Sequence, residues 1–232
     1  MNATNAIASS QVACWSCGAA TQGAHFCASC KKIQPVRREE DYFAFFGMAR
    51  NLQIDEADLE RRFHQLSWKL HPDNFVRATE RERDLSLEMS SELNDAYRTL
   101  RDPLTRVEYL LARAGMRKEG QHKQQAPPEL LEEVFELNES LDELREAKQS
   151  GGDAEERAEI AGRLSTAAKE FEEKLAEVDA ELDSIRAKWD AALAKGADEA
   201  KQRELMSRMN DILNRRSYIR NLVNKVAEEL AA

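Results

Sequence analysis

Apolar residues recur every three or four positions along most of this chain, and that spacing restricts it to folds built from packed amphipathic helices. The longest such stripe runs from Ile160 to Trp189 and comes close to a sustained heptad. Interruptions are rare, because the 232 residues include only five prolines and nine glycines. We therefore predict an all-α protein.

The C-terminal part of the chain contains three of these stripes. One precedes the long stripe and one follows it, and the breaks between them contain Gly151, Gly152 and Gly196. Glycine lets the backbone turn sharply, so the three helices can fold back on one another. We predict an antiparallel three-helix bundle over residues 129–232. The alternative is a long coiled coil between two chains, which the glycine breaks favour less.

Two longer amphipathic helices precede the bundle and are expected to pair as a hairpin. Asp55 is a plausible N-cap of the first helix, and its apolar stripe ends at Leu70. The pattern Thr79-x-x-Glu82 is typical of a capping box at the start of the second. Asp102 then opens a short helix, and a short aromatic-rich helix precedes the pair.

The tripeptide His71-Pro72-Asp73 stands between the two helices of this hairpin. Proline restricts the residue before it and ends helices, so the tripeptide can be read as a plain helix stop followed by a loop. The other reading is a surface signal displayed at the tip of the hairpin.

All the cysteines lie close together near the start of the chain, in two C-x-x-C pairs: Cys14, Cys17, Cys27 and Cys30. Each pair fits a knuckle that directs two thiolates at one ion, and two knuckles complete a tetrahedron around zinc. We predict a structural zinc module over residues 1–38, whose filled shell leaves no open position for catalysis. A redox dithiol pair and an iron-sulfur cluster are the alternatives.

Composition excludes several classes of function. The net charge of −9 argues against general nucleic-acid binding, and no apolar run is long enough to span a membrane. The first 30 residues contain no Lys or Arg, unlike a signal peptide or a mitochondrial presequence, so a cytoplasmic protein is expected. No catalytic triad or carboxylate pair can be identified, and we expect no enzyme activity, although a redox or metal enzyme at the cysteines is the competing hypothesis.

The first helix of the predicted bundle has more apolar surface than one stripe requires. Leu131 and Phe135 each lie one residue past a stripe position, about 100° around the helix. Acidic residues surround this pair. An apolar pair rimmed by acids suits a partner-binding surface, whereas the plainer alternative is a wide stripe that packs inside the protein.

Four stretches of this chain resemble one family of proteins: DYFAFFGM, HPDNF, LNDAYRTLRDPLTRVEYLL and LDELREAK. The hairpin with its tripeptide resembles the J-domain of DnaJ-type co-chaperones, and the four stretches together resemble HscB, the co-chaperone of iron-sulfur cluster biogenesis. The paired cysteine knuckles resemble the zinc module of some eukaryotic members. The resemblance implies a J-domain over residues 39–115. Residues 116–128 are polar and end in two prolines, so we expect them to form a linker.

The resemblance also implies a mechanism and a first partner. A J-domain docks on an ATP-bound chaperone of the heat-shock-70 class, here the specialised HscA or a general DnaK, and triggers ATP hydrolysis. The residues implied in chaperone binding are His71, Pro72, Asp73, Arg61, Arg62 and Lys69. The three basic residues fall outside the apolar stripe and are expected to face solvent. Asn74 stands where many J-domains have a lysine.

The second partner implied by the resemblance is the scaffold protein IscU, which the bundle would hold and deliver to the chaperone. The residues that match the scaffold-binding face of the family are Leu131, Phe135, Glu136, Glu139, Glu143 and Tyr218. They include the apolar pair found above from composition alone. The alternative function is a general J-domain co-chaperone whose bundle binds other clients.

Overall fold

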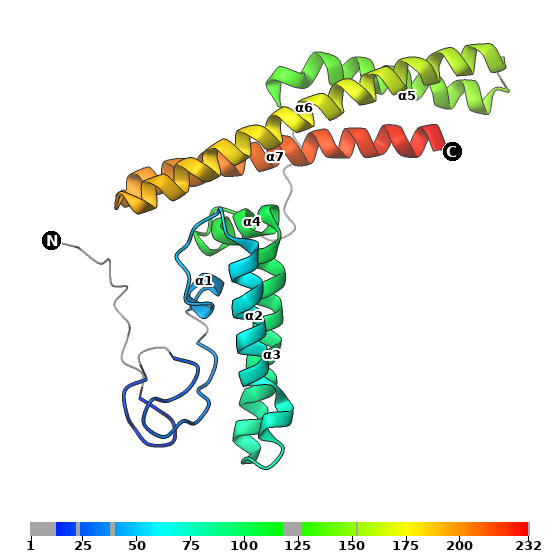
Figure 1. Ribbon diagram of the computed structural model, residues 1–232. Helices are drawn as coiled ribbons and strands as arrows, with labels where there is room; N and C mark the ends of the chain where they lie inside the picture. Colours follow the sequence, from blue (N-terminus) through cyan, green and yellow to red (C-terminus); the bar gives the residue numbers. More distant parts are fainter. Residues whose placement is uncertain (1–12, 22–23, 38–39, 118–126, 152, 232) are drawn as a thin grey trace. The chain divides into compact units, whose positions relative to one another are not determined.

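The computed structural model describes residues 13–21, 24–37, 40–117, 127–151 and 153–231. Within these ranges the regular structure is helical, with two isolated β-bridges, so the all-α prediction is confirmed. The helices follow one another along the chain (Figure 1): α1 (Tyr42–Phe45), α2 (Glu56–Leu70), η1 (Pro72–Phe75), α3 (Glu80–Arg101), α4 (Pro103–Arg113), η2 (Pro128–Leu130), α5 (Leu131–Gln149), α6 (Ala154–Ala194) and α7 (Glu199–Ala231). None of them is both long and apolar enough to cross a membrane.

The chain divides into two compact units. The first contains Met1–Leu110 with the short segment Asp190–Ala197, and the second contains Leu111–Trp189 with Asp198–Ala232. The cysteine module and the helical hairpin therefore belong to one unit. Most of the predicted linker, residues 116–128, lies outside the described residues.

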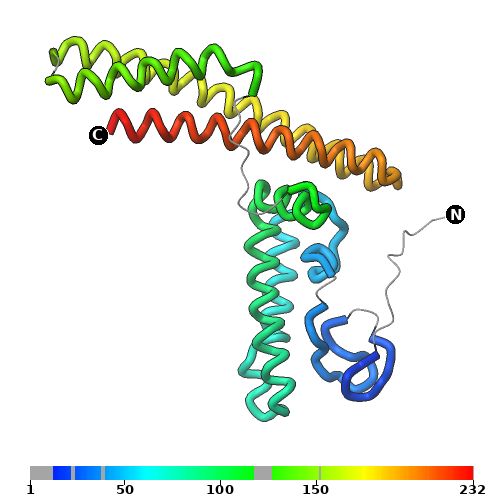
Figure 2. Tube along the Cα trace, turned by 180° about the vertical axis from the view of Figure 1, so that it is seen from behind, coloured from blue at the N-terminus to red at the C-terminus, as the bar shows by residue number. Residues whose placement is uncertain are grey.

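An antiparallel hairpin of α2 and α3 forms the centre of the first unit (Figures 1 and 2). Its predicted caps are confirmed: the Asp55 carboxylate accepts N–H bonds from the first turn of α2, and Thr79 and Glu82 form a reciprocal capping box on α3. The apolar stripes of both helices meet the aromatic side chains of α1. The core they share includes Phe43, Leu59, Leu70, Met89, Leu93 and Leu100.

Two serines of α3 hold the C-terminal end of α2. The hydroxyl of Ser86 donates to the Leu70 carbonyl at 2.6 Å, and the hydroxyl of Ser90 donates to the same oxygen at 3.1 Å. Carbonyls in the last turn of a helix have no partner within the helix, so these bonds satisfy a group that would otherwise lack one. They also fix the point at which the chain leaves α2 and enters the turn.

A buried arginine closes the junction between α3 and α4. Arg106 is only 2% exposed, and its guanidinium donates to the carbonyls of Leu100 at 2.6 Å, Leu52 at 2.6 Å and Arg101 at 3.2 Å. The predicted Asp102 cap is confirmed, because its carboxylate accepts N–H bonds from the first turn of α4. Three carbonyl acceptors keep the buried charge hydrogen-bonded.

The second unit contains α5, α7 and α6 as far as Trp189, which together form the predicted three-helix bundle. Gly151 and Gly196 both have φ of +69°, and each follows the end of a helix, where glycine tolerates this left-handed backbone. Apolar stripes of all three helices are buried. Ion pairs join each pair of helices: Glu143–Arg163 and Glu133–Lys174 for α5 and α6, Asp179–Arg216 and Glu181–Arg215 for α6 and α7, and Arg145–Glu229 for α5 and α7.

Candidate functional site

The turn between α2 and α3 displays the His71-Pro72-Asp73 tripeptide. His71 leaves α2 with φ of −57° and ψ of 130°, and Pro72 starts the short helix η1. The Asp73 N–H donates to His71 Nδ1 at 3.3 Å, and Asn74 Nδ2 donates to the Trp68 carbonyl at 2.6 Å. The side chains of His71 and Asp73 remain 56% and 85% exposed. The turn is thus held by local hydrogen bonds while its two polar side chains face solvent.

The three basic residues of α2 do not share one environment. Lys69 is exposed, and Arg61 is 63% exposed although it pairs with Asp58. Arg62 differs from expectation, because its guanidinium donates to Asp58 at 2.8 Å and to the Phe46 carbonyl at 2.9 Å. The prediction that Arg62 faces solvent is therefore corrected: its side chain is half-buried against the end of α1, where it satisfies a terminal carbonyl.

Sequence reasoning missed the most exposed large hydrophobic side chain among the described residues, which lies near the turn. Trp68 is 81% exposed in the last turn of α2, three residues before His71. A tryptophan outside the apolar stripe of α2 was the available signal. Interface hot spots are enriched in tryptophan, so such exposure distinguishes this end of the hairpin from an ordinary polar surface.

The four cysteines converge on one point. Their Sγ atoms all lie within 4.8 Å of one another, with 3.6 Å between Cys14 and Cys30 and 3.7 Å between Cys17 and Cys27. A disulfide would need about 2.05 Å. A tetrahedral zinc ion with Zn–S bonds of about 2.3 Å requires sulfurs roughly 3.8 Å apart. The cluster therefore has the dimensions of a four-thiolate metal site.

The two knuckles repeat the same backbone pattern. Gly18 follows the first pair and donates its N–H to the Cys14 carbonyl, while Lys31 follows the second and donates to the Cys27 carbonyl, both at 2.9 Å. Gly18 has φ of +75° and Lys31 has φ of +62°. Because the same backbone turn follows each cysteine pair, the thiols of both pairs converge on one position.

Backbone amides around Cys14 and Cys27 favour the thiolate form that a metal needs. The Cys30 amide hydrogen-bonds to Cys27 and lowers the pKa of that thiol, which outweighs the opposing effect of burial. Burial raises the pKa of Cys14, but hydrogen bonds from the amides of Cys17 and Ser16 bring it down to about 6. At Cys17 the amide of Ala19 acts in the same direction, but hydrogen bonds with the neighbouring thiols outweigh it and raise the pKa of that thiol. Four soft sulfur donors in one cluster suit zinc or iron.

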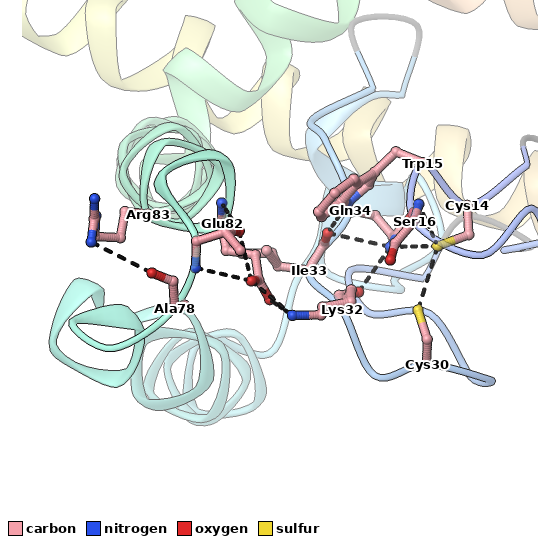
Figure 3. Close-up of polar contacts among 11 residues, drawn as sticks. Cys14, Trp15, Ser16, Cys30, Lys32, Ile33, Gln34, Ala78, Glu82 and Arg83 are labelled. Carbon is pink, nitrogen blue, oxygen red and sulfur yellow. Dashed lines mark hydrogen bonds and ion pairs between the residues drawn. The ribbon is translucent and has the colours of Figure 1, made fainter.

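The cysteine module packs directly on the hairpin. Lys32 Nζ lies 2.8 Å from both carboxylate oxygens of Glu82, which is the N3 residue of the α3 capping box (Figure 3). This hydrogen bond lowers the pKa of Glu82 below its ordinary value, despite burial. The next residue, Ile33, is fully buried in the core of the hairpin.

Aromatic side chains of the module form further contacts with the hairpin. The indole of Trp15 donates to the Ile33 carbonyl at 2.6 Å, and the Arg81 guanidinium lies over its ring at 4.3 Å from the centroid. His25 Nε2 is 2.9 Å from the Phe45 carbonyl, and burial lowers the pKa of His25. His25 is therefore engaged with α1 and lies outside the group of metal-ligand candidates.

The predicted scaffold-binding residues of α5 are exposed. Leu131 and Phe135 are 55% and 70% exposed, and Glu136, Glu139 and Glu143 are also exposed around them. Glu143 pairs with Arg163 of α6 at 2.7 Å. The sixth predicted residue, Tyr218 on α7, is half-buried, and desolvation raises its pKa. Most of the surface of this apolar pair is thus exposed among the described residues, which argues against the wide-stripe alternative.

Comparison with known proteins finds relatives that share one name. The co-chaperone protein HscB homolog of Vibrio vulnificus (strain YJ016) is 31% identical over 171 residues, which cover 74% of this chain and 93% of that protein. The iron-sulfur cluster co-chaperone protein HscB of Mus musculus is 35% identical over 144 residues, or 60% of this chain and 62% of that protein. A scan against models of protein families finds no match.

The fold has a matching relative among solved structures. The crystal structure of human co-chaperone protein HscB aligns with a TM-score of 0.61 and 27% identity. The alignment covers 93% of this chain and 97% of the human chain. Sequence and fold therefore point to the same relatives.

Proposed function

This chain belongs to the HscB family of co-chaperones, and from that premise we propose that it serves iron-sulfur cluster assembly in the cytoplasm. In this proposal it binds the scaffold protein IscU through α5 and brings it to a heat-shock-70-class chaperone, HscA or DnaK. The chaperone hydrolyses ATP, and this chain stimulates that step without being its catalyst. The observation that carries the proposal is the exposed His71-Pro72-Asp73 turn in a chain related to co-chaperones.

The turn has the features that a chaperone-docking signal needs. Pro72 fixes its own φ, which limits the conformations of the turn. The exposed Asp73 carboxylate can accept charge-assisted hydrogen bonds from an arginine of the chaperone. Lys69 and Arg61 lie exposed on the same helix and would steer it toward an acidic surface. Trp68 would add an apolar contact beside them.

Exposure of an apolar pair supports the proposed scaffold site. Leu131 and Phe135 lie one helical turn apart on α5, where an i, i+4 pair shares one face. Acidic residues surround the pair, as in an interface with an apolar centre and a polar rim. Binding the scaffold and the chaperone with one chain raises the effective concentration of each for the other.

Zinc is the metal that we propose for the four cysteines. The sulfur separations fit a tetrahedral zinc site, and four thiolates fill the coordination shell. A filled shell supplies folding energy and offers no position for a substrate.

The steady-state ATPase of the cognate HscA or DnaK tests the chaperone half of the proposal. Stimulation by this protein is expected, and His71→Gln should abolish it because the turn loses its imidazole. Circular dichroism of the variant should match the parent, since His71 is exposed. Absence of stimulation by the parent protein would show that the tripeptide is only a helix stop.

Addition of IscU to the same assay tests the scaffold half. We expect IscU to increase stimulation synergistically, and the double variant Leu131→Ala with Phe135→Ala should remove only that increase. Leu230→Ala, which truncates an exposed apolar residue of α7, is the matched control and should keep the synergy. If IscU adds nothing to stimulation by the parent, the bundle serves another client.

A further inference from the structure

Resting on the function proposed above, we infer that the four-cysteine module is a metal-dependent support for the chaperone-activating turn. Lys32 is the positioning residue, and it acts through Glu82 at the start of α3. The module then has a task of its own: it keeps the His71-Pro72-Asp73 turn in one conformation while metal is bound.

The first link joins the metal site to Lys32. The Lys32 carbonyl accepts the Cys27 N–H of the second knuckle at 2.9 Å and the side-chain amide of Gln34 at 2.8 Å. The same amide nitrogen of Gln34 is 3.4 Å from Cys14 Sγ (Figure 3). The position of Lys32 therefore depends in part on both knuckles.

The second link joins Lys32 to the start of α3. Its ammonium lies 2.8 Å from each oxygen of Glu82, whose side chain is only 7% exposed. One of those oxygens also accepts bonds from the Thr79 hydroxyl at 2.8 Å and the Thr79 N–H at 3.2 Å. A single carboxylate thus connects the module to the N-cap of α3.

The third link joins that cap to the turn. Only five residues separate Asp73 from Thr79. Within them, Phe75 is buried in the hairpin core, and its carbonyl accepts the Ala78 N–H at 2.9 Å. At the other end of the turn, Ser86 of α3 holds the Leu70 carbonyl. Both ends of the turn therefore depend on the position of the first two turns of α3.

Loss of metal would disrupt the first of these three sets of contacts, the one that joins the metal site to Lys32. The module has few residues and little core apart from the hairpin, and small metal modules of this kind fold only when metal is bound. Without the cation the four thiols no longer join the two knuckles, and the hydrogen bonds of Trp15 and Gln34 are the contacts described above that still link them. Lys32 would then be released, and Glu82 would be left as a poorly exposed carboxylate without its cation.

Hydrogen exchange on the intact, zinc-loaded protein tests this inference directly. Lys32→Gln should raise the exchange rate of amides in residues 76–83 about tenfold, since it removes a charge-assisted hydrogen bond from the cap. Lys31→Gln changes the neighbouring exposed lysine in the same way and should leave this segment unaltered. Both variants should retain zinc, measured by its release to a colorimetric chelator. Chelation of zinc from the parent protein should raise the exchange rate of this segment at least as much as Lys32→Gln does. Chelation of zinc from the Lys32→Gln variant should raise its exchange rate by a smaller factor, because the contact is already lost.

ATPase stimulation of the chaperone supplies the second readout. Lys32→Gln should weaken stimulation several-fold while the Lys31→Gln control keeps it. Equal exchange in zinc-loaded and zinc-free parent protein would overturn the inference. Faster exchange in Lys32→Gln with unchanged stimulation would also overturn it, because order in the turn would then be irrelevant to the chaperone. A parent protein that never stimulates would refute the proposed function instead, and the exchange comparison would still decide whether the module supports the turn.

Discussion

A lysine occupies a backbone position that suits glycine in the second cysteine knuckle. Gly18 and Lys31 hold equivalent places after the two cysteine pairs, and both have positive φ. A side chain in this left-handed region costs roughly 1–2 kcal/mol because Cβ approaches the following carbonyl. The repeat of Cys-x-x-Cys was plain in the sequence, but the strain at Lys31 was not, since only the backbone geometry reveals it.

Lys31→Gly should therefore stabilise the first unit by about 1 kcal/mol. Removal of the left-handed cost exceeds the entropy that glycine adds to the unfolded chain, roughly 0.4–1 kcal/mol. Thermal unfolding of the zinc-loaded protein measures the gain. Lys31→Ala keeps Cβ and is the control that should show no such increase. A glycine variant no more stable than the alanine variant would contradict the assigned strain.

Elements were predicted from sequence more fully than the contacts between them. The caps at Asp55 and Thr79 and the glycine breaks of the bundle are local signals, so each could be identified from a few neighbouring residues. The docking of the module on α3 depends on Lys32 and Glu82, which are far apart in sequence and unremarkable alone. Arg106 likewise resembles any surface arginine until its carbonyl partners are known.

Among contacts between elements, one cluster of ion pairs joins the ends of α5 and α7, and its strength depends on pH. Arg145 Nε lies 2.8 Å from Glu229, and Lys148 lies 3.5 Å from the same carboxylate. The hydrogen bond from Arg145, assisted by Lys148, lowers the pKa of Glu229 below its ordinary value of 4.5. A carboxyl group whose pKa is lower in the folded protein stabilises the fold fully at a pH above its ordinary pKa. This stabilisation is lost as the pH falls through the pKa of the folded state.

Glu229→Gln should accordingly lower the melting temperature of the bundle at pH 7 by about 2 °C, the size expected for a partly exposed ion pair. The difference from the parent protein should shrink steadily as the pH falls below 4.5. Thermal melts followed by circular dichroism at a series of pH values measure this difference in melting temperature. Glu177→Gln, at an exposed position of α6, is the matched control. A difference that stays constant down to pH 3 would exclude the ion-pair explanation.

At the scale of the whole molecule, the metal belongs to one unit only. The four cysteines and the hairpin share the first unit, whereas α5 and most of α6 and α7 form the second. Secondary structure and family could both be predicted from the sequence, because they depend on periodicity and short motifs. The single core shared by the module and the hairpin could not be predicted, since no sequence pattern links Ile33 to the stripes of α2 and α3.

Metal removal should therefore affect the two units unequally. Calorimetry of the chelated protein should show the transition of the first unit lowered by about 10 °C, because metal binding contributes to its folding energy. The transition of the second unit should keep its temperature. A variant with Cys14→Ser and Cys17→Ser should reproduce the chelated trace without any chelator. Equal shifts of both transitions would contradict the division into two units.

Glu82 lies 50 positions after Lys32 in the sequence, and that interval has a consequence during synthesis. A ribosome adding about 5–20 residues per second needs roughly 3–10 s to make it. Throughout that time the cysteines of the nascent chain are already made, while the helix that will receive the module is not. The four cysteines are therefore open to metal ions or oxidants before α3 exists, so a metal ion can organise the module before Glu82 is available to Lys32.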